Sequence, residues 1–480
     1  MAPLGNQVKY PFATRPYQHQ LKALRQLWRR GWGGALLWEP GTGKTKCALD
    51  FAGALYLYRG LRRVLVICPI AAFGVWVAEL GKHMPEQVPF TVTVLNKSRS
   101  AEDLHFDKPP DDVLWVVVVN YETAWRIFPQ LRWWKPQLCI IDESHQIKRG
   151  STKKARGCHK LGLLASYRLI LTGTPVTNSP LDLFSQWKFL NPVRFGRSFR
   201  DFAAAYAVFG GYGGHEVLLY KNLDQLREII EMDASIIKKE DCLDLPEKVY
   251  EVIPIDLDSE TAEVYRQMED QMVAELESGE LITAEIILTK LLRLSQITSG
   301  FTSRSNNGAR ETIPLGEEKL GALEELVDTY ALESQQKVVI FCRFIPSLER
   351  IASLLKKKKV PFRVISGDVA YPKRNEAVQW MWSGEGPKVL LAQIATAGLA
   401  IDLSCCHTAI YYELDYSLDH YIQSQDRLHR IGQVHKVLYL HLLARESVDE
   451  DVYRALTDKK DVAERVVGRL SPGARVVSRR

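Results

Sequence analysis

Short apolar runs rich in β-branched residues recur in two series along the chain, and longer stretches with helical periodicity separate them. The first series lies within residues 35–172 and the second within residues 338–443. Runs such as VLVIC (64–68) and VVIFC (338–342) do not alternate apolar with polar positions, which is typical of strands buried on both faces of a parallel sheet. Strands and helices that alternate in two blocks predict an α/β protein with two doubly wound parallel sheets.

The strand signal weakens in two stretches that are much longer than the usual 2–6-residue connection of an α/β sheet. We interpret both as helical insertions, and within the second we expect SRSNNGARET (303–312) to be a flexible loop. The expected organisation is a first sheet domain (1–195), its helical insertion (196–245), a hinge with entry into the second domain (246–255), the second helical insertion (256–318), and a second sheet domain with a C-terminal helix and tail (319–480).

Composition narrows the class of protein but not its ligand. Hydrophobic residues make up 46% and charged residues 25%, which excludes a disordered or fibrous chain. The net charge of +6 permits a polyanionic partner without requiring one. We expect no membrane partner and a cytoplasmic, nucleoid location, because the N-terminus lacks an apolar signal region and no run reaches about 18 apolar residues. None of the 8 cysteines has C-x-x-C spacing, so we expect reduced, mostly buried thiols.

The strongest local motif is GTGKT (41–45), which follows the apolar run ALLW (35–38) and precedes a helical stretch. Backbone N–H groups of such a loop cradle phosphates, while Lys44 reaches the β- and γ-phosphates and the Thr45 hydroxyl holds Mg²⁺. Trp38 stands where the full eight-residue pattern has its first glycine. The predicted ATP-binding residues of the loop are Gly41, Thr42, Gly43, Lys44 and Thr45.

A pair of carboxylates and a pair of hydroxyls follow two later strands. In DESH (142–145), Asp142 would hold Mg²⁺ and Glu143 would orient and deprotonate the attacking water. In LTGTP (171–175), Thr172 and Thr174 would lie at the carboxyl edge of the sheet, where open α/β sheets bind ligands.

The segment QSQDRLHRIGQ (423–433) closes the second series and carries Arg427 and Arg430 three positions apart. On a helix these side chains share a face. Arginines that project into a cleft can neutralise charge on the γ-phosphate, an effect worth about 10³–10⁵ in rate. Two arginines taken alone are more typical of a solvated basic helix, so the assignment depends on the family resemblance.

Together the motifs resemble the Swi/Snf-type, chromatin-remodeller-like ATPases of helicase superfamily two. The resembling segments run in order along nearly the whole chain and include RPYQ (15–18), GTGKT, DESH, LTGTP, ATAGLAIDL (395–403) and QSQDRLHRIGQ. The last is the most diagnostic, because other branches of the superfamily carry glycines where this chain has Asp426 and His429. The residues of DESH and QSQDRLHRIGQ are similar to those of a distant branch that contains annealing helicases and many bacterial and phage proteins.

The resemblance implies two RecA-like lobes that use ATP and Mg²⁺. It implies that Gln18 reads adenine and that Gln423, Arg427 and Arg430 close on the nucleotide. Gly398 and Asp402 would contribute to DNA contact and coupling, as would Thr172 and Thr174. The family usually has Gly and Asn where this chain has Ala400 and Asp402.

The family acts on DNA, and basic residues are the candidates for phosphate contacts. They lie after DESH and at the end of a helix: Lys148, Arg149, Lys153, Lys154 and Arg156, and the run 356–359. Either group is also compatible with a solvated surface, and the second would favour a helix macrodipole as well.

The sequence therefore predicts an enzyme, a DNA-dependent ATPase that translocates on double-stranded DNA, forked or branched DNA included, and that acts as a monomer. One alternative is a fork-remodelling or strand-annealing helicase. Another is a motor or a nucleotide-gated DNA-binding subunit that serves a separate nuclease or methyltransferase.

Overall fold

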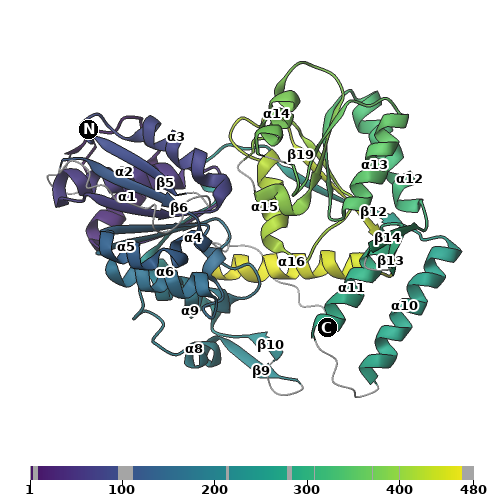
Figure 1. Cartoon of the computed structure of the whole chain (residues 1–480), viewed down its shortest axis with the longest axis horizontal. Helices are drawn as coiled ribbons and strands as arrows, with labels where there is room; N and C mark the ends of the chain where they lie inside the picture. Colours follow the sequence, from purple (N-terminus) through teal and green to yellow (C-terminus); the bar gives the residue numbers. More distant parts are fainter. Residues whose placement is uncertain are drawn as a thin grey trace. The chain divides into compact units, whose positions relative to one another are not determined.

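The computed structural model describes residues 2–3, 9–95, 112–211, 216–277, 284–306, 309–369, 371–398 and 401–467. Its chain forms two units, Met1–Asp244 with Lys459–Arg480 and Leu245–Asp458 (Figure 1). Each unit contains its own parallel sheet, so the prediction of an α/β protein with two parallel sheets is confirmed. No helix in these ranges is long and apolar enough to cross a lipid bilayer.

The sheet of the first unit has seven strands in the order β11-β3-β8-β7-β4-β6-β5, and every neighbouring pair is parallel. The strands are β3 (Gly33–Trp38), β4 (Arg63–Ile67), β5 (Phe90–Leu95), β6 (Leu114–Val119), β7 (Leu138–Asp142), β8 (Tyr167–Thr172) and β11 (Ala234–Ile237). All residues of β3 and β6 are buried, as expected for strands covered on both faces. A short pair, β1 (Ala2–Pro3) and β2 (Lys9–Tyr10), precedes them.

Helices cover both faces of this sheet, and alternate residues of one strand enter different cores. Leu36 of β3 packs in the core with Leu24 of the first helix, whereas Leu37 packs in the opposite core with Trp187. The first core is built by α1 (Gln18–Arg30), α2 (Lys44–Arg59) and α3 (Phe73–His83). The second is built by α4 (Tyr121–Arg126), α5 (Phe128–Trp134), α6 (Lys153–Leu164), α7 (Leu183–Leu190), α8 (Phe199–Tyr206) and α9 (Leu223–Asp233).

The segment 196–245, expected to be a helical insertion, is only partly helical. Besides α8 and α9 it contains a hairpin, β9 (Ala207–Gly210) with β10 (Glu216–Tyr220), and β11. Strand β11 pairs in parallel with β3, so part of this segment belongs to the main sheet. Its four-residue run ASII is too short to be distinguished from the end of the preceding helix by periodicity.

The sheet of the second unit has six strands in the order β12-β19-β18-β15-β17-β16, again with parallel neighbours. They are β12 (Lys248–Ile255), β15 (Lys337–Cys342), β16 (Phe362–Ile365), β17 (Lys388–Gln393), β18 (Thr408–Tyr411) and β19 (Val437–Ala444). Most of the segment expected as a hinge is β12, an edge strand that pairs with β19 along its whole length.

Helices pack on this second sheet as well. A core that contains Ile340 of β15 is completed by α12 (Glu318–Leu326), the π-helical turn η7 (Val327–Glu333) and α13 (Ile345–Lys357). The other helices are α10 (Ser259–Glu277), α11 (Ala284–Thr298), α14 (Tyr371–Trp382), α15 (Leu418–Leu428) and α16 (Val448–Val467). Tyr265 of α10 accepts a hydrogen bond from the backbone N–H of Val448 at 2.8 Å, which joins the start of α16 to α10.

The segment 303–312, expected as a flexible loop, falls mainly on a hairpin. Its strands are β13 (Phe301–Asn306) and β14 (Ala309–Pro314), which pair antiparallel, and residues 307–308 lie outside the described residues. The expectation is therefore wrong for the strands. These strands are rich in polar residues and lack an apolar face, so neither the helical period of about 3.6 residues nor the strand period of 2 residues predicts them.

Candidate nucleotide site

The loop GTGKT connects the carboxyl end of β3 to the first turn of α2. Gly41 and Gly43 have φ values of 84° and 85°, in the left-handed region that side chains other than glycine rarely adopt. A Cβ atom at Gly43 would also lie 2.1 Å from Nε2 of Gln20, so the Gln20 side chain would have to move. The glycines thus allow the chain to turn sharply so that the free N–H groups of α2 face the loop, the arrangement that binds phosphate.

Trp38, which replaces the first glycine of the phosphate-loop pattern, is part of the core beneath the loop. Its side chain is fully buried, and its indole N–H donates to Oγ of Ser235 at 3.0 Å. Its backbone carbonyl accepts a hydrogen bond from Nζ of Lys44 at 2.7 Å. The tryptophan therefore holds the lysine through its main chain while its side chain points away into the core.

Two residues of α1 contact the loop, and neither is the glutamine that the sequence singles out. The His19 Nε2–H donates to the carbonyl of Thr42 at 2.8 Å. The buried Gln20 amide lies 3.5 Å from the carbonyl oxygens of both Thr42 and Gly43, and its own oxygen accepts from the N–H of Tyr17 at 2.9 Å. Gln18 is exposed, so its assignment to adenine stays a prediction.

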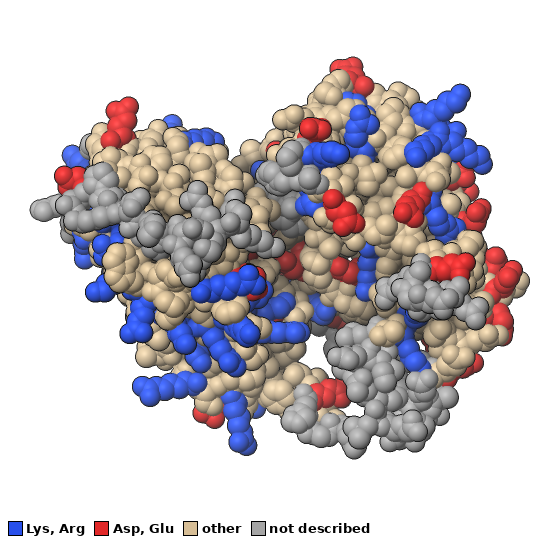
Figure 2. Space-filling view, in the orientation of Figure 1, with Lys and Arg blue, Asp and Glu red and all other residues tan. Residues whose placement is uncertain are grey.

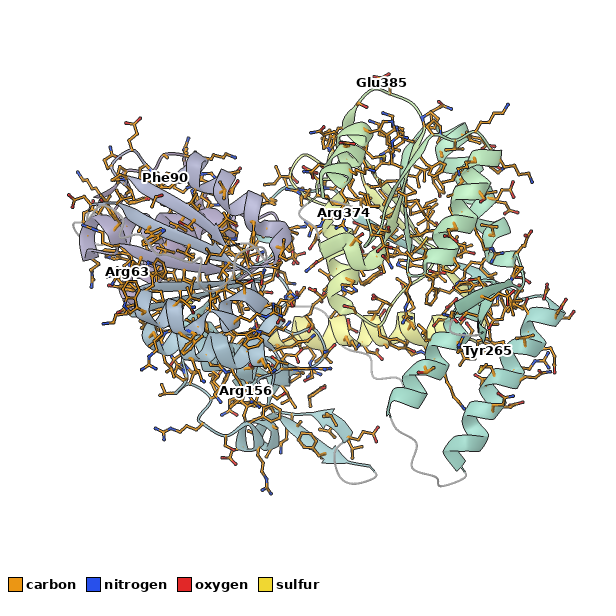
Figure 3. The ribbon with its side chains drawn as sticks, viewed as in Figure 1. Arg63, Phe90, Arg156, Tyr265, Arg374 and Glu385 are labelled. Atoms are coloured by element: carbon orange, nitrogen blue, oxygen red, sulfur yellow. The ribbon has the colours of Figure 1, made fainter. Side chains whose placement is uncertain are left out.

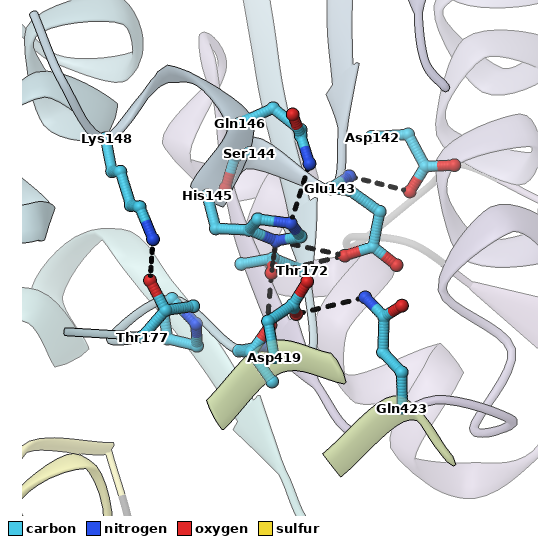
Figure 4. A network of polar contacts seen from close by, with 12 residues as sticks. Asp142, Glu143, Ser144, His145, Gln146, Lys148, Thr172, Thr177, Asp419 and Gln423 are labelled. Atoms are coloured by element: carbon cyan, nitrogen blue, oxygen red, sulfur yellow. Dashed lines mark hydrogen bonds and ion pairs between the residues drawn. The ribbon is translucent and has the colours of Figure 1, made fainter. Parts of the chain in front are cut away.

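Asp142 ends β7, and both of its carboxylate oxygens are hydrogen-bonded. Oδ2 accepts from the indole of Trp76 at 2.9 Å. Oδ1 accepts from the N–H of Glu143 at 3.1 Å (Figure 4). Burial, and then the neighbouring Glu143 carboxylate, raise the pKa of Asp142 to about 6. The Lys44 ammonium acts in the opposite direction, so the fold brings this lysine within electrostatic range of Asp142.

Glu143 adopts a left-handed backbone conformation, with φ of 56°, which is unusual for a residue with a side chain. Its Oε2 lies 3.4 Å from Nδ1 of His145 and 3.5 Å from Oγ1 of Thr172 (Figure 4). Thr172 also accepts a hydrogen bond from the N–H of Thr174 at 3.1 Å. The fold thus brings Thr172, the last residue of β8, to the carboxylate of Glu143, and Thr174 lies next to Thr172.

His145 is a residue of this network that motif reasoning overlooked. Its Nε2 lies 3.1 Å from the amide nitrogen of Gln146, which can only donate, so the ring proton sits on Nδ1 (Figure 4). That N–H points to Glu143 and Thr172, at 3.4 Å from each. The only signal in the sequence was the position of the histidine in DESH, two residues after Glu143.

The basic residues after DESH differ in their environment. Lys148 is half-buried, and its ammonium donates to Oγ1 of Thr177 at 2.5 Å (Figure 4). Arg149 is exposed. Of the second basic group, Lys358 pairs with Asp328 and Glu324, at 2.7 and 2.8 Å, and these contacts raise its pKa.

The residues present fit a magnesium–triphosphate complex. Thr45 lies in the first turn of α2, which follows the phosphate loop. Asp142 is the last residue of β7, at the same carboxyl edge of the sheet. Hydroxyl and carboxylate oxygens are the ligands that Mg²⁺ takes when phosphates and water complete its shell. The raised pKa of Asp142 also fits a carboxylate that gains a cation as its partner.

In the second unit, Gln423 and Arg427 lie on α15, which the Ser417 side chain caps. Gln423 is buried, and its amide donates to Oδ1 of Asp419 at 3.0 Å. The helix ends at Leu428, so Arg430 lies beyond it. The expectation that Arg427 and Arg430 share one helical face is therefore wrong, because the helical spacing stops before the second arginine.

Arg430 contacts the chain just after Gly398, which ends η8 (Ile394–Gly398). Its Nη1 donates to the carbonyl of Ile401 at 3.4 Å, and its Nε lies 3.7 Å from Oδ2 of Asp402. The fold thus brings together Asp402 and Arg430, which were predicted for different roles. Ala400 lies outside the described residues.

Asp426 and His429, the residues most diagnostic in the sequence, anchor α15 to the beginning of the second unit. His429 Nε2 lies 2.6 Å from the carbonyl oxygen of Pro246, and Asp426 Oδ1 lies 3.8 Å from Nζ of Lys248. On the same helix, Gln425 accepts a hydrogen bond from the hydroxyl of Tyr250 at 3.0 Å. The arginine-bearing helix is thus held against the segment 246–250.

Known proteins are similar to this chain over most of its length. A curated relative named an uncharacterized ATP-dependent helicase, from Mycoplasma pneumoniae, is 24% identical over 95% of this chain and 42% of its own length. The human DNA annealing helicase and endonuclease ZRANB3 is 25% identical over 88% of this chain and 38% of its own length. The chain therefore spans about two fifths of these relatives.

One solved structure, the Sulfolobus solfataricus SWI2/SNF2 ATPase core in complex with dsDNA, aligns with 96% of this chain and 94% of its own. Its sequence identity to this chain is 23% and the TM-score is 0.45.

The family models match both halves of the chain. Residues 17–300 match the SNF2-related domain, and residues 318–432 match the helicase conserved C-terminal domain. The first match alone covers more than half of the 480 residues and contains GTGKT, DESH and LTGTP. The second contains Asp402, Gln423, Arg427 and Arg430. With its site geometry and these two matches, the chain belongs to the SNF2-related family of helicase-like ATPases.

Proposed function

We propose that this chain is a DNA-dependent ATPase that moves along double-stranded DNA. The observation that carries the proposal is the meeting, at one sheet edge, of a cationic phosphate loop, the carboxylates of Asp142 and Glu143, and the hydroxyl of Thr172. Family membership supports the same activity.

Hydrolysis requires a bound phosphate chain, a metal ion and a positioned water. In our proposal Lys44 leaves the carbonyl of Trp38 to bind the β- and γ-phosphates. Thr45 and Asp142 would hold Mg²⁺, which would supply positive charge next to the phosphates. Glu143 orients the attacking water and takes its proton, and the N–H of His145 and the hydroxyl of Thr172 hold this carboxylate in place.

The second unit contributes the cationic part of the proposal. Gln423, Arg427 and Arg430 would close on the nucleotide and stabilise charge that develops in the transition state. Arg430 would have to exchange Asp402 for phosphate oxygens, which makes Asp402 a competitor for the same guanidinium. Gly398 and Asp402 would contact DNA and couple ATP hydrolysis to movement on it.

A basic surface of the first unit is the proposed DNA contact. Figure 2 shows Lys and Arg side chains gathered over α5 and α6, and Figure 3 labels Arg156 among them. The exposed members on α4–α6 and the preceding turn are Arg126, Arg132, Arg149, Lys153, Arg156 and Lys160. Aromatic rings lie among these cations, since the ammonium of Lys153 is 5.4 Å from the Trp125 ring centroid. Such a surface suits phosphates, which carry most of the affinity and little sequence information.

A strand-annealing or fork-remodelling activity is the second candidate. It is favoured by the similarity to ZRANB3, whose name describes an annealing helicase, over 88% of this chain. Service to a separate nuclease or methyltransferase is a further possibility for the same motor.

The test is ATP turnover measured without DNA and with single-stranded, blunt duplex and forked DNA. We expect stimulation by blunt duplex, and displacement of a third strand from a triplex as the protein tracks along it. Lys44→Ala should abolish turnover, because it removes the loop's only side-chain cation, whereas Lys9→Ala, a change at an exposed lysine of the same unit, should not.

Turnover that does not depend on DNA would contradict the proposal. Efficient separation of a tailed duplex without triplex displacement would favour a strand-separating helicase instead. Stimulation by forked DNA alone, together with annealing of complementary strands, would favour the second candidate.

A further inference from the structure

The first unit contains a large cavity whose lining includes Gln18 and His19 but no residue of GTGKT or DESH. Its volume is about 1560 Å³, and its walls are α1, the segment 11–16 before it, and residues 81–87 at the end of α3. Small-molecule sites usually measure about 300–1,000 Å³. This cavity, which we call the α1 groove, is thus larger than one nucleotide requires, although the exposed Gln18 lies at one of its ends.

The lining of the α1 groove is strongly cationic. It includes five basic side chains, Arg15, Lys22, Arg25, Arg29 and Lys82, and a single acidic one, Glu86. Three of these lie along one face of α1, at positions i, i+3 and i+7. At about 1.5 Å per residue, they extend over about 10 Å of the helix. Lys82 faces them from the other wall, so a ligand in the groove meets positive charge on two sides.

The α1 groove and the basic surface on α4–α6 lie on opposite faces of one sheet. Leu24 of α1 and Leu80 of α3 belong to the core on one face, whereas Leu131 of α5 and Cys158 of α6 belong to the core on the other. Packed layers are about 10 Å apart, so two layer spacings, about 20 Å of protein, separate the two surfaces. A straight stretch of duplex bound at α4–α6 therefore does not reach the groove.

We propose that the α1 groove is a second nucleic-acid site, which binds the phosphate backbone of a strand separate from the duplex on which the protein moves. In a duplex each strand carries one phosphate per about 3.4 Å of helix axis, and successive phosphates of an extended strand lie farther apart, so the 10 Å of basic positions on α1 corresponds to about two or three phosphates. The assignment of nucleic acid as the ligand rests on the proposed function, whereas the site itself rests on the shape and charge of the groove.

One molecule would then hold two segments of nucleic acid at once, one on each face of the first sheet. Such bridging would serve strand annealing or fork remodelling, because both require two strands to be brought together. It would add nothing to hydrolysis, since Lys22, Arg29 and Lys82 make no contact with the phosphate loop or DESH among the described hydrogen bonds and ion pairs.

The test compares variants of the two walls with a control of matched charge. The double variant Lys22→Glu/Arg29→Glu changes the α1 wall, and Lys82→Glu changes the opposite wall. If one of these proteins fails to fold, the other still tests the proposal. The control is Lys9→Glu/Arg59→Glu, two exposed residues that do not line the groove. Each protein is bound to a bead-tethered blunt duplex, and capture of a labelled oligothymidylate is measured at several salt concentrations.

We expect both wall variants to lower capture of the oligothymidylate at least tenfold, while the control stays within twofold of the wild type. The slope of log affinity against log salt should become shallower by about 0.7 for each phosphate that a variant no longer neutralises. Turnover at saturating blunt duplex should be unchanged in all variants.

Capture that is the same in wall variants and control would overturn the proposal. So would competition by polyglutamate at concentrations where oligothymidylate does not compete, which would indicate an acidic peptide as the ligand. Failure of the proposed function is distinguishable, because it would appear as a wild-type protein without duplex-stimulated turnover.

Discussion

The carboxylate of Asp402 lies 3.7 Å from the guanidinium Nε of Arg430, within the second unit. Its other oxygen accepts hydrogen bonds from the N–H and the hydroxyl of Ser404, at 3.0 and 2.8 Å, so the aspartate is held in place by the turn that follows it. An arginine proposed to act on phosphate is thus paired with a fixed anion of its own chain. Hydrolysis through Arg430 would have to break this pair.

Replacing Asp402 by asparagine should raise ATP turnover. The amide oxygen can still accept from Ser404, while the negative charge that holds Arg430 is removed. A partly exposed ion pair contributes about 0.2–1 kcal/mol, so the expected gain in kcat is up to about fivefold. The measurement is steady-state turnover at saturating DNA.

The matched control for this change is Asp256→Asn, since Asp256 forms a comparable exposed pair with Arg445 at 3.3 Å. The control should leave turnover unchanged. A drop in kcat for Asp402→Asn would mean that the aspartate presents Arg430 to the nucleotide rather than competing for it.

Arg430→Ala should reduce turnover by about 10³ and leave nucleotide affinity nearly intact, as expected for a cation that acts mainly in the transition state. Single-turnover hydrolysis and equilibrium binding of a fluorescent ATP analogue separate the two quantities. Arg445→Ala is the control, because it removes an arginine of the same unit outside the proposed site. Weakened binding with normal turnover per bound ATP would contradict the role assigned to Arg430.

Gln20 and Gln18 should produce different defects when each is replaced by alanine. Gln20 lies against the carbonyls of Thr42 and Gly43, so its loss should loosen the loop and raise KM for ATP and GTP alike, by about fivefold for a loss near 1 kcal/mol. Gln18 does not hold the loop, and its predicted contact is with the base. Gln18→Ala should therefore lower the ratio of kcat/KM for ATP to kcat/KM for GTP.

Kinetics with the two nucleotides check this difference, and each variant serves as the control for the other. Equal losses of base preference in both variants would show that adenine recognition does not depend on Gln18 in particular.

His441 should make the stability of the second unit sensitive to acid. Its Nδ1–H donates to the carbonyl of Glu251 at 3.4 Å, and its Nε2 accepts from the hydroxyl of Tyr421 at 2.9 Å, so the folded state holds the neutral ring. Burial lowers its pKa from 6.5 to about 4. The unfolded chain therefore binds a proton that the folded chain does not, and the free energy of unfolding falls as pH drops from about 6.5 toward 4.

His441→Gln should remove this dependence, because glutamine can donate and accept in the same way without titrating. Between pH 7.5 and 5 the wild type should lose about 2 kcal/mol more unfolding free energy than the variant, as measured by urea unfolding. His420→Gln, a change at a partly exposed histidine, is the control. Identical pH profiles for wild type and His441→Gln would contradict the prediction.

Much of the fold was predictable because its central strands are locally encoded. Runs such as LWVVVV and VVIFC are apolar at every position, and they became strands buried on both faces. The motifs GTGKT and DESH follow such strands directly, so their place at the carboxyl edge of the first sheet followed from the same pattern. Peripheral strands such as β11 were missed because pairing with a segment about 200 residues away, not their own period, makes them strands.

By itself the sequence determined two parallel sheets, the phosphate loop and the carboxylates of DESH. Each of these features is encoded by consecutive residues, whose apolar pattern or spacing identifies it without any distant contact. Only the tertiary structure decided that Gln20 holds the loop, that α15 ends before Arg430, and that Asp402 reaches this arginine. The same holds for the cationic α1 groove, whose walls come from separate segments. Such contacts depend on where two distant parts of the chain come to lie once the apolar cores are packed. The local pattern of apolar residues contains no information about which distant segments become neighbours.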